Sequence, residues 1–340
     1  MNATPARQAD PLPAHRVREM LDRIARVRVA VCGDFCLDAY WMLDPRGGEI
    51  SAETGLRAQA VGQHRYSLGG AANVVANVAA LGPASVRAIG VVGDDVYGRE
   101  LLRQLRELGV DTAGMIIQPR QFDTVTYGKR YGADGEEPRI DFGFFNRRSE
   151  DTDRAILAHL RQALEKCDAV AFNQQVPGSL SDTFLGGLNA LVGAFPDNVV
   201  LCDSRHYGAR IVNGHRKTNE IEAAGLGGAF AARLHAGSGK PVFVTRGARG
   251  ILTIDAEGEH VAPGIPLSGP IDNVGAGDTV TAALALCLGA GFPPAEAAGF
   301  ANLAAAVTVQ KIRQTGTASP EEVLAMAEYG PRAEAEGDRP

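Results

Sequence analysis

Short runs of apolar, often β-branched residues alternate along the chain with longer segments whose apolar residues recur at helical spacing. The short runs predict buried strands at residues 27–34, 86–94, 169–173, 198–205 and 241–247. The longer segments predict helices at residues 69–82, 94–110, 152–167 and 181–195. In the second of these, Leu101, Leu102, Leu105 and Leu108 form one stripe, which Gly109 ends. This alternation predicts an α/β fold with a mostly parallel sheet that is covered on both faces.

Two segments depart from this alternation, at about residues 39–67 and 121–146. They contain alternating stretches such as DTVTYGKRYG (123–132) and EPRIDFGFF (137–145), which predict antiparallel strands or hairpins. Because they are interspersed with the main pattern, we expect a small β-sheet lid that projects from the main sheet, and not a separate domain.

Composition then bounds the class of protein. The 340 residues are 45% hydrophobic and 22% charged, which is ordinary for a globular protein with a sizeable core. The formal net charge of -6 disfavours a general nucleic-acid role, since such proteins usually show a basic balance. No apolar run reaches the roughly 18 residues that a membrane span needs, so no membrane partner is expected.

The ends and the cysteines complete the outline. We expect one domain over residues 16–330, preceded by a disordered lead-in at 1–15 and followed by a flexible tail at 331–340. The first residues lack the apolar stretch of a secretory signal. Five cysteines are too few, and odd in number, for a disulfide framework, which favours reduced thiols in a cytoplasmic protein.

The segment IDNVGAGDTVTAAL (271–284) places a carboxylate beside a glycine turn at the start of a predicted helix. Amide N–H groups without helical partners, together with the helix dipole, favour an anion at Gly275, Ala276 and Gly277. Asp278 follows them directly. The residues alone leave two interpretations open. Asp278 is a helix cap worth about 1 kcal/mol, or it is a general base beside a site for a transferring phosphoryl group.

A glycine–lysine pair near residue 240 does not make a P-loop. Leu234 stands where the first glycine of that motif would be, and Pro241 replaces the Ser or Thr that would hold magnesium. A strand, and not a helix, follows this segment.

Five segments stand in a fixed order: GDFCLD (33–38), GGAANVVANVAALG (69–82), NEIE (219–222), VTRGARG (244–250) and DNVGAGD (272–278). With these segments, the chain resembles the PfkB/ribokinase family of ATP-dependent sugar kinases from residue 28 to about residue 328. That resemblance implies a ribokinase-like three-layer α/β/α sandwich with a small β-sheet lid. It also implies ATP and Mg²⁺ as cofactors, and leaves a monovalent cation open.

Other segments most resemble the heptose-7-phosphate kinase half of bifunctional ADP-heptose-forming proteins. They are GDFCLDAYW (33–41), EISAE (49–53), TVTYGKR (124–130), RIDF (139–142) and residues 300–323. Nothing resembles the nucleotidyltransferase half. The usual Asp-Pro-Lys is DSRH (203–206) here, and FNQQVPG (172–178) also departs from the family pattern. Both departures should lie near the active site, so the identity of the sugar stays open.

The resemblance implies a role for each motif residue. Asp278 would be the general base toward the sugar hydroxyl, with the anion hole for the γ-phosphate at Gly275, Ala276 and Gly277. Glu222 would act on magnesium directly or through its water shell, with Asn219 near the phosphates; an ordinary helix face is the alternative. The nucleotide would be bordered by Thr245, Gly247, Gly250 and, at the adenine pocket, Asn302.

On the sugar side, carboxylates after the first strand suit hydroxyl groups, which donate hydrogen bonds to them. We expect such contacts from Asp34 and Asp38, for which a capping or turn role is the alternative, and from Gly69, Gly70 and Asn73. Lys129 and Arg139 in the lid, and Arg205, are either a solvated charged face or clamps for a substrate phosphate. We expect at least one of the lid cations, or Arg205, to meet that phosphate.

The leading hypothesis is an ATP- and Mg²⁺-dependent sugar kinase acting on a phosphorylated heptose or a similar sugar. Two alternatives remain: a ribokinase- or fructokinase-like kinase of an unphosphorylated sugar or a nucleoside, and a non-catalytic sensor of a sugar or nucleotide. Exposed β edges on the lid favour pairing with a second subunit, so a homodimer is expected.

Overall fold

The computed structural model describes residues 6–225, 230–312 and 314–330. The expectations for residues 1–5 and for the tail at 331–340 lie outside the described residues. Within the rest of the expected lead-in, the structure differs from the prediction. Strand β1 (Arg7–Gln8) pairs in parallel with β15 (Gly258–Ala262), and helix α1 (Ala14–Ile24) begins before residue 16. Val17, Met20 and Ile24 of that helix are fully buried, which fixes it against the core.

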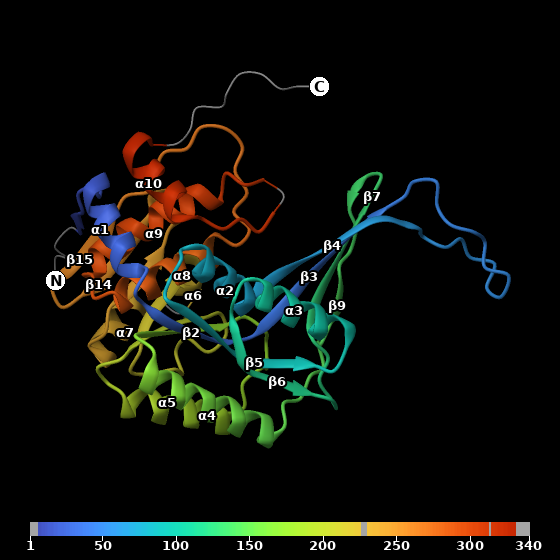
Figure 1. The fold of residues 1–340 in the computed structure, drawn as a ribbon, viewed down its shortest axis with the longest axis horizontal. Coiled ribbons are helices and arrows are strands. Elements are labelled where there is room, and N and C mark those ends of the chain that lie inside the picture. The colour runs from blue at the N-terminus through green and yellow to red at the C-terminus, as the bar shows by residue number, and fades with distance from the viewer. Residues whose placement is uncertain (1–5, 226–229, 313, 331–340) are drawn as a thin grey trace.

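The described residues form one large sheet with the strand order β1-β15-β14-β13-β12-β11-β10-β2-β5-β6 (Figure 1). Its neighbours pair in parallel except β13 with β14 and β14 with β15. The five predicted strands are β2 (Arg28–Gly33), β5 (Ser85–Gly93), β10 (Ala169–Gln174), β11 (Val199–Ser204) and β13 (Val242–Thr245). The apolar pattern did not predict β6 (Asp111–Gln118), β12 (His215–Asn219), β14 (Ile251–Asp255) or β15.

The helices lie on both faces of this sheet. The four predicted helices are α2 (Ala71–Ala80), α3 (Val96–Glu107), α4 (Glu150–Lys166) and α5 (Asp182–Ala194). The others are α6 (Glu220–Gly225), α7 (Phe230–Ser238), α8 (Ala276–Gly289), α9 (Pro294–Thr308) and α10 (Pro320–Tyr329), with a short 3₁₀ turn at Gly247–Arg249.

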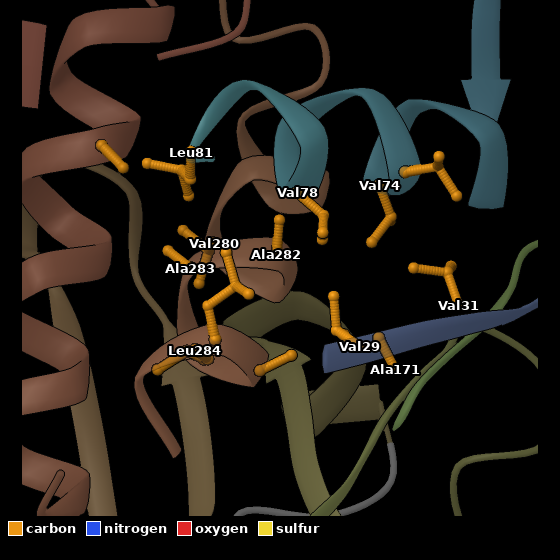
Figure 2. Packing of buried hydrophobic residues seen from close by; sticks show 14 of the residues in the cluster. Val29, Val31, Val74, Val78, Leu81, Ala171, Val280, Ala282, Ala283 and Leu284 are labelled. Carbon is orange, nitrogen blue, oxygen red and sulfur yellow. The ribbon is translucent and has the colours of Figure 1, made fainter. Parts of the chain in front are cut away.

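Strand β2 explains why both faces must be covered, because its side chains alternate between two apolar cores. Val29 and Val31 pack on one side with α2 and α8, and Figure 2 shows them facing Val74 and Val78 across that core. Ala30 and Cys32 pack on the other side with α4 and α5. The predicted three-layer α/β/α architecture is therefore confirmed. The five cysteines are free, as expected.

The predicted small sheet is also present. It has the order β4-β3-β7-β8, with β9 paired to β7. These strands are β3 (Phe35–Leu43), β4 (Val61–Gly70), β7 (Val125–Gly132), β8 (Gly135–Glu136) and β9 (Ile140–Phe142). β3 follows β2 after one residue, Asp34, so the small sheet continues directly from the main one and projects away from it (Figure 1). None of the described helices is long and apolar enough to cross a bilayer.

Candidate active site

A cleft of about 400 Å³ lies where the carboxyl ends of the main strands meet the lid. Parallel α/β sheets bind ligands at this edge. Most of the predicted site residues line the cleft: Asp38, Gly69, Gly70, Asn73, Arg139, Arg205, Asn219, Glu222, Gly275, Gly277 and Asp278. They come from segments up to 240 residues apart in the sequence, and the fold brings them together.

Asp278 does not act as a helix cap in this structure. The N-cap of α8 is Gly275, with φ of 82°, and no side chain caps this helix. The carboxylate of Asp278 instead accepts hydrogen bonds from Asn73 Nδ2 at 2.7 Å and Gln175 Nε2 at 3.1 Å. Removal from water raises the pKa of Asp278 to about 6. The group therefore sits in the cleft, held by side chains, with a proton affinity suited to acid–base chemistry near neutral pH.

The glycine turn before Asp278 is set by steric limits. A Cβ at Gly275 would lie 2.9 Å from Asn73 Nδ2 and 2.9 Å from Thr315, and its φ is one that other residues rarely adopt. This turn brings the first amides of α8 to the cleft wall, where an anion would meet them. Ala276 does not itself line the cleft.

The structure does not bring Asp34 to the cleft. Its Oδ2 accepts hydrogen bonds from the backbone N–H groups of Gln175 at 3.0 Å and Val176 at 2.8 Å, and from the Ser179 hydroxyl at 3.0 Å. Asp34 lines a separate cavity of about 330 Å³. The turn role is therefore the one that the structure supports for Asp34. Its carboxylate holds the loop that carries Gln175 to Asp278.

The predicted cations have different surroundings. Lys129 lies 3.3 Å from Asp38 Oδ2 and 3.3 Å from the Tyr40 hydroxyl, and it does not line the cleft. Arg139 lines the cleft but makes two hydrogen bonds to the carboxylate of Asp141. Arg205 lines the cleft with an exposed side chain, and no carboxylate among the described residues pairs with it.

Asn219 and Glu222 cap each other at the start of α6. Asn219 Oδ1 accepts from the Glu222 N–H at 2.8 Å, and Glu222 Oε2 accepts from the Asn219 N–H and the Thr218 hydroxyl, both at 3.1 Å. Both side chains also line the cleft. Among the described residues no three His, Cys, Asp or Glu side chains gather as a metal site. One carboxylate beside a phosphate site still suits Mg²⁺, which keeps waters and takes few protein ligands.

The expected nucleotide residues lie beyond the cleft lining. Thr245, Gly247, Gly250 and Asn302 are not on its wall. Thr245 pairs with Asn219 across β12 and β13, which places it next to a residue of the cleft wall. Asn302 Nδ2 donates to the carbonyl groups of Ala262 at 2.9 Å and Pro263 at 3.1 Å. Gly250 approaches the same carbonyl of Ala262 so closely that a Cβ would lie 2.1 Å from it.

The cleft residues that the sequence analysis did not predict as site residues include Gln175, Asp203 and Lys217. The first two lie in FNQQVPG and DSRH, which already stood out as departures from the family pattern. Lys217 lies on β12, a strand that the apolar pattern did not predict. Its ammonium group lies 2.7 Å from Asp203 Oδ2.

A model of pfkB family carbohydrate kinases matches residues 44–190 and 216–322 of the chain. The chain belongs to this family. It is therefore a carbohydrate kinase, a phosphotransferase with an alcohol group as acceptor, and the predicted family is confirmed.

Curated relatives agree with this assignment. Bifunctional protein HldE of Wolinella succinogenes is 32% identical over 305 residues, and that of Coxiella burnetii (strain RSA 493) is 32% identical over 315 residues. The matches cover 86% and 87% of this chain but 63% of each relative. The chain thus spans less than two thirds of the length of these relatives.

Solved structures share the fold. A ribokinase from Thermotoga maritima has a TM-score of 0.69 at 20% identity, covering 89% of this chain and 99% of its own. Phosphofructokinase-2 from Escherichia coli, in complex with potassium, has a TM-score of 0.68 at 22% identity with the same coverage. An Arabidopsis thaliana ribokinase complexed with ribose and ATP has a TM-score of 0.67 at 18% identity, also covering 89% and 99%.

Proposed function

We propose that this carbohydrate kinase uses ATP and Mg²⁺ and transfers the γ-phosphate to a hydroxyl of a phosphorylated heptose or a similar sugar phosphate. The observation that carries the proposal is the carboxylate of Asp278, which faces the cleft beside the first turn of α8 and bonds to side chains rather than capping the helix. The Arabidopsis ribokinase, which shares the fold, is complexed with ribose and ATP, and this supports ATP as the nucleotide.

The residues suggest a division of labour. Asp278 would accept the proton of the attacking hydroxyl while that oxygen bonds to phosphorus and the bond to the leaving ADP oxygen breaks. The amides at Gly275 and Gly277 would stabilise the charge on the phosphoryl oxygens. Glu222 and Asn219 would hold Mg²⁺ and its water shell, and that ion neutralises phosphate charge. Asp38 and Asn73 would orient the sugar hydroxyls.

The choice of a phosphorylated sugar as the substrate rests on Arg205. A guanidinium with no carboxylate partner among the described residues, on the wall of a cleft that also contains carboxylates, is a ready partner for a phosphate on the substrate. The segments that resemble heptose-7-phosphate kinases favour a heptose as the sugar.

A coupled ADP-release assay tests the proposal. The panel should pair heptose 7-phosphate and fructose 6-phosphate with heptose and fructose, and include ribose and adenosine. We expect the highest kcat/KM with a sugar phosphate. Turnover confined to an unphosphorylated sugar or to adenosine would overturn the substrate class. Tight sugar binding without any turnover would instead identify a sensor.

The pH dependence of turnover should follow Asp278. Since its pKa is raised to about 6, the carboxyl group stays protonated up to a higher pH than an ordinary aspartate, and the protonated form cannot act as a base. We therefore expect kcat/KM to fall about tenfold per pH unit below pH 6. The bond from Asn73 lowers this pKa, so Asn73→Ala should move the acid limb to higher pH. A flat profile down to pH 5 would contradict the assignment.

We also infer that two copies pair through the lid. β4 is an edge strand of the small sheet, and its first residue, Val61, is 48% exposed. The segment before it exposes Ile50 and Leu56 by 61% and 71%. Sedimentation velocity at micromolar concentration should give a dimer, and Leu56→Lys should shift it toward monomer. A monomeric wild type under these conditions would contradict the pairing.

A further inference from the structure

Lys217 is a buried cation at the carboxyl end of the sheet, and it belongs to none of the sequence motifs. It lies on β12 and its side chain is 7% exposed, while that of its partner Asp203, on β11, is 11% exposed. The hydroxyl of Thr281, on α8, donates to the same Asp203 oxygen at 2.9 Å. Two strands and one helix thus fix the position of this ammonium group.

The ammonium group also reaches the glycine turn. Lys217 lines the cleft together with Gly275, Gly277 and Asp278. A Cβ at Gly277 would lie 3.2 Å from Lys217 Nζ, so the lysine occupies the space directly over that glycine. An anion held by the first amides of α8 would therefore meet the ammonium group as well.

The charge of Lys217 is secured by its partner. Burial disfavours a charged ammonium group, and the carboxylate of Asp203 at 2.7 Å compensates for that cost. The ion pair with Asp203 thus supplies a fixed positive charge beside the glycine turn. It has no part in proton transfer, which remains with Asp278.

We propose that Lys217 is a catalytic residue, whose ammonium group contacts an oxygen of the transferring phosphoryl group, and that Asp203 is the positioning residue that holds it. This deepens the proposed function and rests on it. Asp278 takes the proton of the acceptor hydroxyl, the new oxygen–phosphorus bond forms as the bond to ADP breaks, and Lys217 keeps its own proton. A fixed cation favours this step because charge on the equatorial oxygens needs preorganised partners.

The competing interpretation is a buried ion pair that only supports the fold. Lys217→Met alone cannot separate the two, because it leaves Asp203 buried without its partner. The double variant Lys217→Met/Asp203→Asn removes both charges and keeps two side chains of similar volume. A structural pair predicts that the double variant regains the kcat lost by the single one.

The catalytic proposal predicts otherwise. Both variants should lose about 10²–10³-fold in kcat, the range seen when one preorganised donor is removed, with the KM for the sugar changed less than about threefold. Their pH profiles should differ, because Asp203 raises the pKa of Asp278 and Lys217 lowers it. The single variant should move the acid limb to higher pH, and the double variant should move it back. Lys166→Met, an exposed lysine at the end of α4, is the matched control.

A binding readout separates this inference from the proposed function. ADP with aluminium fluoride mimics the transferring phosphoryl group, and calorimetry should show at least a tenfold loss of its affinity in the double variant, with the affinity for ADP unchanged. Equal affinity for the mimic, or a double variant with kcat near that of wild type, would overturn the role of Lys217. A wild type that binds the mimic but turns over no sugar would contradict the proposed function alone.

Discussion

Asp278→Asn is expected to lower kcat by about 10²–10⁴-fold, the usual range when a general base is removed. The amide cannot take the proton of the attacking hydroxyl, but it keeps the volume of the carboxylate and an oxygen for Asn73 or Gln175 to bond to. The fold should therefore survive. Because the carboxylate is desolvated in the wild type, loss of its charge should not lower the melting temperature.

The measurement is kcat by ADP release, with thermal shifts for ATP and the sugar as a check on binding. Ligand binding adds about RT ln(1 + [L]/Kd) to stability, so both shifts should persist in the variant. Asp197→Asn, at an exposed carboxylate before β11 and thus at the opposite end of the strands, is the matched control. A variant that kept kcat within about threefold of wild type would remove Asp278 from the catalytic role.

The apolar pattern predicted several strands whose side chains are buried by apolar packing, and it missed β12, which is buried by other means. β10 and β11 read as apolar runs because helices cover both of their faces. β12, with the sequence HRKTN, lies in the same sheet, yet Arg216 and Lys217 are buried in it. A lysine enters a sheet interior only with a partner such as Asp203, and that partner is not visible from local sequence.

The same limit applies to the two aspartates after the first strand. Asp34 and Asp38 carry the same local signal, and both follow an apolar run. Only the course of the loop after β10, about 140 residues later, distinguishes their roles. Backbone amides of that loop donate hydrogen bonds to the Asp34 carboxylate. Asp38 instead lines the cleft and pairs with Lys129. Motif order could place Asp278 at the site, but Gln175, which bonds to it, is set by tertiary contacts.

Arg205→Gln is expected to lower kcat/KM for the sugar phosphate by about 100-fold and to leave kcat/KM for the unphosphorylated sugar nearly unchanged. A guanidinium binds a phosphate through two charge-assisted hydrogen bonds, each worth about 1.5–3 kcal/mol before solvent competition reduces it. Most of the loss should fall on KM, since Arg205 would hold a part of the substrate that does not react. The preference for a phosphorylated substrate should largely disappear.

Arg205 is the sharper test of substrate class because the other predicted cations are already engaged. Lys129 is balanced by Asp38 and Arg139 by Asp141, so a substrate phosphate would have to compete with those carboxylates. Arg210→Gln, an exposed arginine paired with Asp182 outside the cleft, is the matched control. Equal losses for the phosphorylated and unphosphorylated sugars would mean that Arg205 orders the cleft instead of binding the phosphate. The substrate of this kinase would then need no phosphate of its own.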